Sequence, residues 1–343
     1  MPETDKYIRE NVRVLTPYSC ARDDFQGKEG IFMDANENPY GNLNRYPDPY
    51  QRELKKAISI IKGVPEEYIF LGNGSDEIID LCYRIFCNPG VDKALTFVPT
   101  YGMYEVSAAI NDVALIKIPL SDDFQIKPES LARLSEEPGL KLIFICSPNN
   151  PTGNSFNSKM IETVVSGFNG IVVIDEAYID FAEQPSLKAF VVRYSNLIVM
   201  QTFSKAMGLA AARVGMAFMD PSIVHYFNKM KPPYNISTIN QKAALNSLSR
   251  IELLKKRITR IKTERERLAA SLKKMSIIEK IFPSDSNFLL VKTKNADLIY
   301  NKLINNKIIV RNRDKILPGC IRITVGTVSE NNRLIRALQS IEI

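Results

Sequence analysis

Seven short apolar segments, separated by stretches of helical spacing, constrain the fold of this chain more than any other feature. Each is rich in Val, Ile, Leu and Phe over about five residues, without the polar alternation of a half-exposed strand. Such segments are typical of parallel strands covered by helices on both faces. The segments are 68–71, 94–98, 114–118, 142–146, 171–174, 197–200 and 216–219. The sequence therefore predicts an α/β fold with a mostly parallel seven-stranded sheet.

The composition changes after Pro232 and Pro233. Two helices are expected there, at 241–248 and 250–275, and the interruption of the second one's apolar stripe by Arg265 favours packing within the chain over a coiled coil. Three strands (287–291, 308–311, 321–325) and two helices (296–305, 330–341) follow, which predict a smaller α/β domain. The expected division is an N-terminal arm at 1–28, a large domain at 29–233 and a small domain at 234–343.

Composition excludes several classes of protein. The chain has 343 residues, 45% of them hydrophobic and 24% charged, and no apolar run approaches the roughly 20 residues that span a bilayer. Because its first residues do not resemble a signal peptide, we expect a cytoplasmic protein without membrane contact. The net charge of +7 could suit nucleic acid. However, acids are interleaved with the lysines of 250–274, so small anionic substrates fit equally well and no nucleic-acid partner is predicted.

Cysteine and histidine usage argues against metal and disulfide chemistry. The five cysteines are scattered and mostly lie in apolar runs, which predicts reduced packing residues, and no CxxC pair occurs. The single histidine, His225, excludes a mechanism that needs two imidazoles and a His-rich metal site. Its apolar neighbours predict a packed side chain in a helix. We therefore expect no metal.

Polar residues follow the apolar segment 197–200, where a turn of Gly, Asn or Pro would be usual. Lys205 is either a solvated surface amine or an amine whose pKa is lowered by partial burial, able to form a Schiff base with an aldehyde cofactor. In the second case Thr202, Ser204 and Arg213 become anion ligands. Ligands of parallel sheets bind beyond the carboxyl ends of the strands, which is where these residues lie.

Two further strand ends carry unusual residues. Asp175 ends an apolar segment, and a carboxylate there is costly to bury unless a positive charge, such as a protonated ring nitrogen, faces it. The glycine-rich turn at 72–77 opens a helix, where Ser75 is either a simple N-cap or part of an anion site. Glu77 replaces the third glycine of a dinucleotide fingerprint, so NAD is not expected.

Taken together, these motifs resemble the fold type I, class II pyridoxal-phosphate-dependent aminotransferases, and most closely the histidinol-phosphate aminotransferase family. The resemblance covers nearly the whole chain. Its motifs are 36–41 (Asn-Glu-Asn-Pro-Tyr-Gly), 45–47 (Arg-Tyr-Pro), 74–76 (Gly-Ser-Asp), 99–104 (Pro-Thr-Tyr-Gly-Met-Tyr), 147–153 (Ser-Pro-Asn-Asn-Pro-Thr-Gly), 175–178 (Asp-Glu-Ala-Tyr), 202–205 (Thr-Phe-Ser-Lys) with Arg213, and 319–326 (Gly-Cys-Ile-Arg-Ile-Thr-Val-Gly).

The resemblance implies a role for each matching residue around pyridoxal 5'-phosphate. Lys205 is similar to the lysine that forms the internal aldimine, and Asp175 to the carboxylate that keeps the pyridine nitrogen protonated. Asn150 and Tyr178 match the groups on the ring's 3-oxygen, and Tyr101 matches the ring stacked on the cofactor face. The matching phosphate cup consists of Gly74, Ser75, Asp76, Thr202, Ser204 and Arg213, joined by Tyr46 from the neighbouring subunit of a homodimer.

Substrate contacts are implied in the same way. Arg322 matches the arginine for an α-carboxylate, and Arg311 and Tyr18 match positions that help take the substrate phosphate. Asn36, from the first motif, is expected at the substrate as well. The sequence alone also allows Tyr18 to be no more than an anchor for the N-terminal arm.

The activity implied is ping-pong transamination of L-histidinol phosphate with 2-oxoglutarate, giving imidazole-acetol phosphate and glutamate in histidine biosynthesis. Two alternatives use the same motifs: an aromatic amino acid aminotransferase, and a lyase similar to threonine-phosphate decarboxylase. A non-catalytic regulator lacks support because no helix-turn-helix segment is visible.

Overall fold

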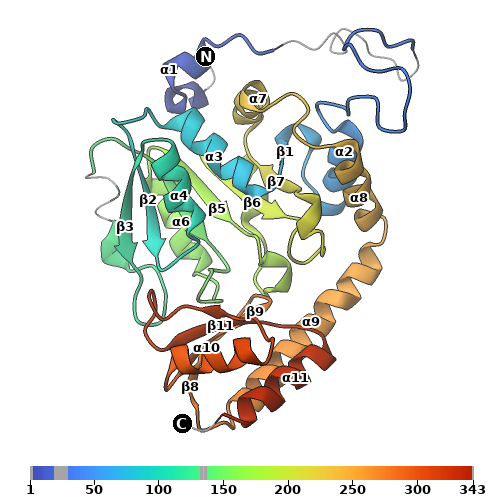
Figure 1. Ribbon diagram of the computed structural model, residues 1–343. Helices are drawn as coiled ribbons and strands as arrows, with labels where there is room; N and C mark the ends of the chain where they lie inside the picture. The colour runs from blue at the N-terminus through green and yellow to red at the C-terminus, as the bar shows by residue number, and fades with distance from the viewer. Residues whose placement is uncertain (1–2, 19–29, 132–133, 135–136, 342–343) are drawn as a thin grey trace.

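The computed structural model describes residues 3–18, 30–131, 134 and 137–341 (Figure 1). Part of the expected N-terminal arm, including Cys20, lies outside these residues. The described part of the arm forms a 3-10 helix (Glu3–Tyr7) and α1 (Glu10–Arg13), and Ile8 and Val12 are buried in the core beneath α7 (Pro221–Met230). Within the described residues, no helix is long and apolar enough to cross a membrane.

All seven predicted segments are strands of one sheet, in the order β1-β7-β6-β5-β4-β2-β3. Strands β4 to β7 are neighbours in chain order, and only β7 runs against the rest of the sheet, since it pairs antiparallel with both β1 and β6. The predicted fold class is therefore confirmed. The strands are β1 (Ile69–Gly72), β2 (Lys93–Val98), β3 (Ala114–Pro119), β4 (Leu140–Cys146), β5 (Ile171–Asp175), β6 (Leu197–Thr202) and β7 (Gly215–Phe218).

The two faces of this sheet bury two separate cores because neighbouring strand residues point to opposite sides. In β5, Val172 and Ile174 belong to one core, whereas Ile171 and Val173 belong to the other. Helices α2 (Arg52–Lys62), α6 (Ser158–Gly167) and α8 (Thr238–Leu248) cover the first core, and α3 (Ser75–Phe86), α4 (Met103–Ile110) and α7 cover the second (Figure 1). This covering explains the continuous apolar character of the strands.

A smaller antiparallel sheet, in the order β10-β11-β9-β8, follows in the chain. Its strands are β8 (Ile278–Ile281), β9 (Phe288–Thr293), β10 (Arg311–Asn312) and β11 (Cys320–Thr324), packed by α10 (Ala296–Asn305) and α11 (Val328–Gln339). Strand β8 is absent from the sequence prediction, because its polar middle residues, Glu279 and Lys280, interrupt the apolar pattern. The predicted domain boundary at 233 stays a prediction.

Helix α9 (Ile251–Leu272) joins the two sheets, running from beside α8 to α11 (Figure 1). Leu254, near its start, belongs to a core of the large sheet, while Leu268 and Leu272 belong to the core of the small one. Arg265, expected to break the apolar stripe, is itself buried and donates to the Ser286 carbonyl at 2.9 Å. A fourth cluster, of Tyr178, Phe181, Ala206 and Phe288, packs the two sheets together directly.

The cysteine prediction holds for the described residues, while the histidine prediction does not. Cys82, Cys87, Cys146 and Cys320 are free and buried. The packed environment expected for His225 was wrong, because this side chain lies on the exposed face of α7 beside the ring of Tyr226.

Helix α11 offers a test of local stability. Thr327 and Glu330 form a capping box, in which the Glu330 amide donates to Oγ1 of Thr327 and the Thr327 amide donates to Glu330 at 2.7 Å. We expect Thr327→Ala to lower the free energy of unfolding by about 1 kcal/mol. Thr259→Ala, on an exposed face inside α9, is the control and should change it by less than about 0.5 kcal/mol. Equal urea midpoints for the two variants would contradict the capping role.

Candidate active site

A pocket of about 370 Å³ opens beyond the carboxyl ends of β4, β5 and β6, with strands β10 and β11 of the small sheet on its far side. Twelve of the sequence-predicted site residues line it: Ser75, Asp76, Tyr101, Asn150, Asp175, Tyr178, Thr202, Ser204, Lys205, Arg213, Arg311 and Arg322. They come from segments as far apart as helix α3 and strand β11. The fold therefore places in one pocket residues that are far apart in the sequence.

Asp175 forms the floor of the pocket at the last position of β5. It is 4% exposed, accepts a hydrogen bond from the Tyr104 hydroxyl at 2.7 Å and another from the Ala177 amide at 3.0 Å. Burial raises its pKa to about 6, and these two hydrogen bonds oppose the rise. Among the described residues no cation forms an ion pair with this carboxylate, so the floor of the pocket suits a positively charged ligand group.

Tyr104 is a site residue that the sequence analysis quoted in a motif but gave no role. Its ring lies in the core between helix α4 and the sheet, stacked on Phe144 with a centroid separation of 4.8 Å. Burial raises the pKa of its hydroxyl well above the ordinary value, so it remains a donor to Asp175. An aromatic residue on a helix gives no signal in sequence that distinguishes this role from core packing.

Lys205 stands above this floor in the turn after β6, with its amine 5.6 Å from the centre of the Tyr178 ring. The side chain is open to the solvent in the pocket. Nevertheless, the surrounding walls desolvate the amine and, together with the positive charge of Arg322, lower its pKa. Tyr178 is buried and packs edge-on against Phe288 of β9. Lys205 is therefore an accessible amine that loses its proton more easily than a surface lysine.

One end of the pocket is the N-terminus of helix α3. Gly74, the residue before the helix, has φ +78° and no side chain to cap the first turn. A Cβ at this position would lie 2.6 Å from Nη2 of Arg213, so only glycine allows the guanidinium to approach. Arg213 pairs with Asp76 at 3.0 Å, and Asp76 also accepts a hydrogen bond from Tyr101 at 3.1 Å. Helix amides and a guanidinium in this arrangement suit an anion.

Two hydroxyls line the same end of the pocket. Oγ1 of Thr202 donates to Oγ of Ser204 at 3.0 Å and accepts from the Ser204 amide at 3.1 Å. Gly215, on β7, packs against the same turn so closely that a Cβ there would lie 2.5 Å from the Ser75 amide nitrogen. The sequence analysis did not single out Gly215, since a glycine at the start of a strand has no distinctive neighbours.

Asn150 reaches the pocket from the elaborate loop after β4. Its side-chain oxygen accepts a hydrogen bond from Nη1 of Arg322. The neighbouring Asn149 is fully buried and fixes the loop, accepting from Thr100 and donating to the Pro99 carbonyl and to Thr152, each at 2.8 Å. These hydrogen bonds fix the loop that carries Asn150.

The opposite end of the pocket is rich in arginine. Arg311 of β10 and Arg322 of β11 are cross-strand partners, and the Arg322 guanidinium lies 5.1 Å from the centre of the Phe288 ring. Arg313 also lines the pocket, although the sequence analysis did not select it. Burial is the first cause that lowers the pKa of Arg322, and the same effect lowers that of Arg313 to about 10. This end can therefore receive anionic substrate groups.

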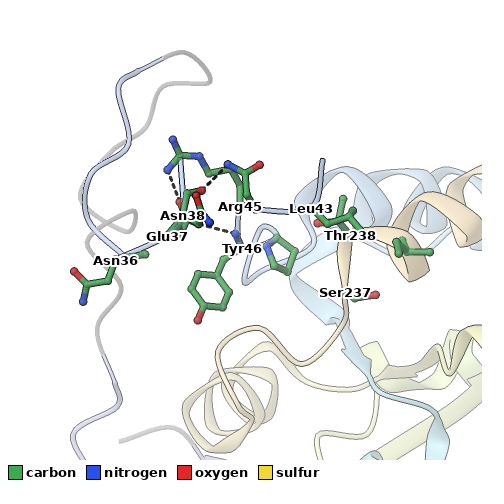
Figure 2. Close-up of a pocket in the computed structure, with 12 residues that line it drawn as sticks. Asn36, Glu37, Asn38, Leu43, Arg45, Tyr46, Ser237 and Thr238 are labelled. Atoms are coloured by element: carbon green, nitrogen blue, oxygen red, sulfur yellow. Dashed lines mark hydrogen bonds and ion pairs between the residues drawn. The ribbon is translucent and has the colours of Figure 1, made fainter. Parts of the chain in front are cut away.

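Three predicted residues lie outside this pocket in their own chain. Tyr46 and Asn36 line a second pocket, of about 460 Å³, beside the start of α8 (Figure 2). There Tyr46 stacks on Tyr234 with a centroid separation of 4.3 Å, and its amide donates to Glu37, which also pairs with Arg45 at 2.6 Å (Figure 2). Tyr18 is 75% exposed. Their contacts with cofactor or substrate stay predictions.

The described residues contain no group of three or more His, Cys, Asp or Glu side chains placed to hold a metal ion. The functional groups that line the pocket are an amine, carboxylates, hydroxyls and arginines.

Known proteins with similar sequences and structures include aminotransferases. The family described as aminotransferase class I and II matches residues 31–338. A histidinol-phosphate aminotransferase of Cytophaga hutchinsonii is 47% identical over 343 residues, covering 98% of each chain, and one of Parabacteroides distasonis is 46% identical over the full length of both. The crystal structure of histidinol-phosphate aminotransferase from Sinorhizobium meliloti in complex with pyridoxal-5'-phosphate superposes with a TM-score of 0.79, at 26% identity, over 89% of this chain and 88% of that one.

The buried carboxylate makes a prediction for the protein without cofactor. Its pKa is raised from 3.8 to about 6, so as the pH rises the unfolded chain releases this proton first, and stability falls between about pH 4 and pH 6. Asp175→Asn removes the charge and should raise the free energy of unfolding at pH 8 by about 3 kcal/mol, with little gain at pH 4.

Urea unfolding at both pH values checks this expectation. Asp122→Asn is the matched control, because Asp122 is exposed and its substitution should leave stability within about 0.5 kcal/mol at both values. A gain for Asp175→Asn that is the same at pH 4 and pH 8 would show that its ionisation does not destabilise the folded protein.

Proposed function

The chain belongs to the aminotransferase class I and II family, and from this premise we propose that it transfers the amino group of L-histidinol phosphate to 2-oxoglutarate. The products are imidazole-acetol phosphate and glutamate, and the reaction is a step of histidine biosynthesis. The observation that carries the proposal is one pocket that combines a reactive lysine, a buried carboxylate, a helix N-terminus and a group of arginines. Relatives of this name match the chain over its full length.

The cofactor is pyridoxal 5'-phosphate, and the residues present fit its three functional parts. The unpaired carboxylate of Asp175 suits the protonated ring nitrogen, and the amine of Lys205 suits the aldehyde. The uncapped first turn of α3 with Arg213 suits the phosphate. When bound, the cofactor supplies a ring that accepts the electron pair left behind when a proton leaves the substrate α carbon.

Lys205 acts as the general base at the substrate α carbon. A lowered pKa leaves a larger fraction of the amine neutral near pH 7, which is the form that accepts a proton. Tyr178 and Asn150 line the same pocket and would hold the ring through its 3-oxygen. Tyr104 positions Asp175 through the 2.7 Å hydrogen bond, and this carboxylate would face the ring nitrogen.

The arginines explain how one pocket serves two different anions. L-Histidinol phosphate carries a phosphate and no α-carboxylate, whereas 2-oxoglutarate carries two carboxylates. Arg311 and Arg322 lie side by side on paired strands, and their forked donors can bind either kind of oxyanion. Arg322 takes the α-carboxylate, and Arg311, with Tyr18, takes the phosphate of the donor.

A homodimer completes the site in this proposal, with Tyr46 of one subunit reaching the cofactor phosphate of the other. The segment that carries it exposes large apolar side chains, among them Ile31, Met33, Tyr40 and Leu43, which favours burial against a second copy. Asn36 lies in the same segment and approaches the substrate from the same side. The cytoplasmic location expected from the sequence belongs to this proposal as well.

Replacing the lysine tests the assigned reaction. Lys205→Ala should abolish formation of glutamate from L-histidinol phosphate and 2-oxoglutarate. It should also abolish covalent attachment of the cofactor, measured by mass spectrometry after borohydride reduction. Lys159→Ala, at an exposed lysine, should retain both.

Two outcomes with the unmodified protein would contradict the assignment. Release of carbon dioxide from threonine phosphate would identify the lyase. Activity with aromatic amino acids alone would show that the assigned donor is wrong.

Mixing two inactive variants tests the shared site. Tyr46→Ala and Lys205→Ala are each expected to lose most activity. When they are mixed after gentle denaturation, about a quarter of the original activity should return, because half of randomly formed dimers are mixed and each of these has one intact site. No recovery would place Tyr46 in the site of its own subunit, and full activity of Tyr46→Ala alone would remove it from the site.

A further inference from the structure

Three arginines of the small sheet line the active-site pocket, and the matched family motifs account for only two of them. Arg311 and Arg322 face each other across β10 and β11. Arg313 follows directly after β10, and its amide donates to the Cys320 carbonyl at 2.9 Å, which holds the backbone of the turn beside β11. The third guanidinium therefore belongs to the same rigid hairpin as the other two.

These three cations lack anionic partners. Among the described residues, no carboxylate forms an ion pair with Arg311, Arg313 or Arg322, although Arg213 at the other end of the pocket has Asp76. Nε of Arg313 and Nε of Arg322 are buried without a hydrogen-bond partner. Asp314, the nearest acid in the chain, is turned into its own loop, where it accepts from the Gly319 amide at 2.6 Å. Two buried donor atoms beside three positive charges are unfavourable unless a ligand supplies acceptors and negative charge.

The three guanidinium groups are not equally available. Arg322 already donates to Asn150 and lies over the ring of Phe288, so it is fixed toward the large sheet. The side chain of Arg313 makes no hydrogen bond to any described residue, and both Arg311 and Arg322 lower its pKa by their charge. Arg313 is thus a half-buried side chain that lines the pocket, and its Nη atoms make no hydrogen bond to a described residue.

We propose that Arg313 is a specificity residue of this pocket, and that it binds the phosphate group of the donor substrate together with Arg311. The proposal rests on the function proposed above. A phosphate monoester dianion offers three terminal oxygens and two charges at one point, whereas each carboxylate of 2-oxoglutarate offers two oxygens and one charge. A second guanidinium beside Arg311, without an anionic partner among the described residues, therefore favours the phosphorylated donor over the acceptor.

The two half-reactions of the cofactor-loaded enzyme separate these substrates. Arg313→Gln should raise the apparent dissociation constant of L-histidinol phosphate by about tenfold or more, and that of 2-oxoglutarate, measured on the aminated enzyme, by less than about threefold. Arg313→Lys keeps the charge but not the forked donors, so its apparent dissociation constant for L-histidinol phosphate should lie between those of the original protein and Arg313→Gln. It also provides a second variant if Arg313→Gln folds poorly. Lys315→Gln removes the same charge from the same exposed loop without touching the pocket and should change neither constant by more than about twofold.

Equal weakening of both substrates by Arg313→Gln, or an effect no larger than that of Lys315→Gln, would overturn the proposal. Inorganic phosphate provides a readout independent of turnover, because the cofactor phosphate already fills the site at α3 in the loaded enzyme. Arg313→Gln should weaken stabilisation of the loaded protein by phosphate in thermal unfolding, and unchanged stabilisation would contradict the assignment. If the original protein fails to use L-histidinol phosphate, the proposed function fails, while the phosphate measurement still decides the role of Arg313.

Discussion

The pocket depends on the burial of one negative charge, the carboxylate of Asp175, at the end of a central strand. A neutral hydroxyl and a backbone amide are its only hydrogen-bond donors in the described structure. The buried negative charge is therefore not compensated by a cation there, and a cationic ring nitrogen can compensate it. The other residues proposed to hold the cofactor lie around this point. Neighbouring parallel strands end at the same edge of the sheet, which places Lys205 above the carboxylate and the start of α3 to one side.

The end of the pocket lined by Arg311, Arg313 and Arg322 carries positive charge instead. No acid among the described residues forms an ion pair with these arginines, so a ligand that binds there has to carry negative charge. The two ends are held at a fixed separation by the contact of Tyr178 and Phe181 with Phe288 and by the passage of α9 through both cores. The two ends of the pocket therefore differ in charge and in the sheet that carries them.

The sequence was sufficient for the large sheet and for most of the pocket lining. Continuous apolar runs identify fully buried strands, and Lys205, Asp175 and Arg322 stand out because charged residues border or interrupt such runs. The same reasoning misses β8, whose charged middle residues break the apolar run, and Tyr104, whose hydrogen bond to Asp175 exists only once helix and sheet are packed. Arg313 lies in a polar turn of alternating charges, where its direction cannot be inferred from spacing.

The hairpin of β10 and β11 has a consequence for how enzymes of this architecture diverge. All three arginines at this end of the pocket lie within residues 311–322, whereas the lining residues at the other end are drawn from positions 75–213. A few substitutions in one short hairpin can therefore change which anionic groups the pocket receives while Lys205 and Asp175 keep their surroundings. Two chains of this architecture can then differ in the anions they accept without differing around the lysine.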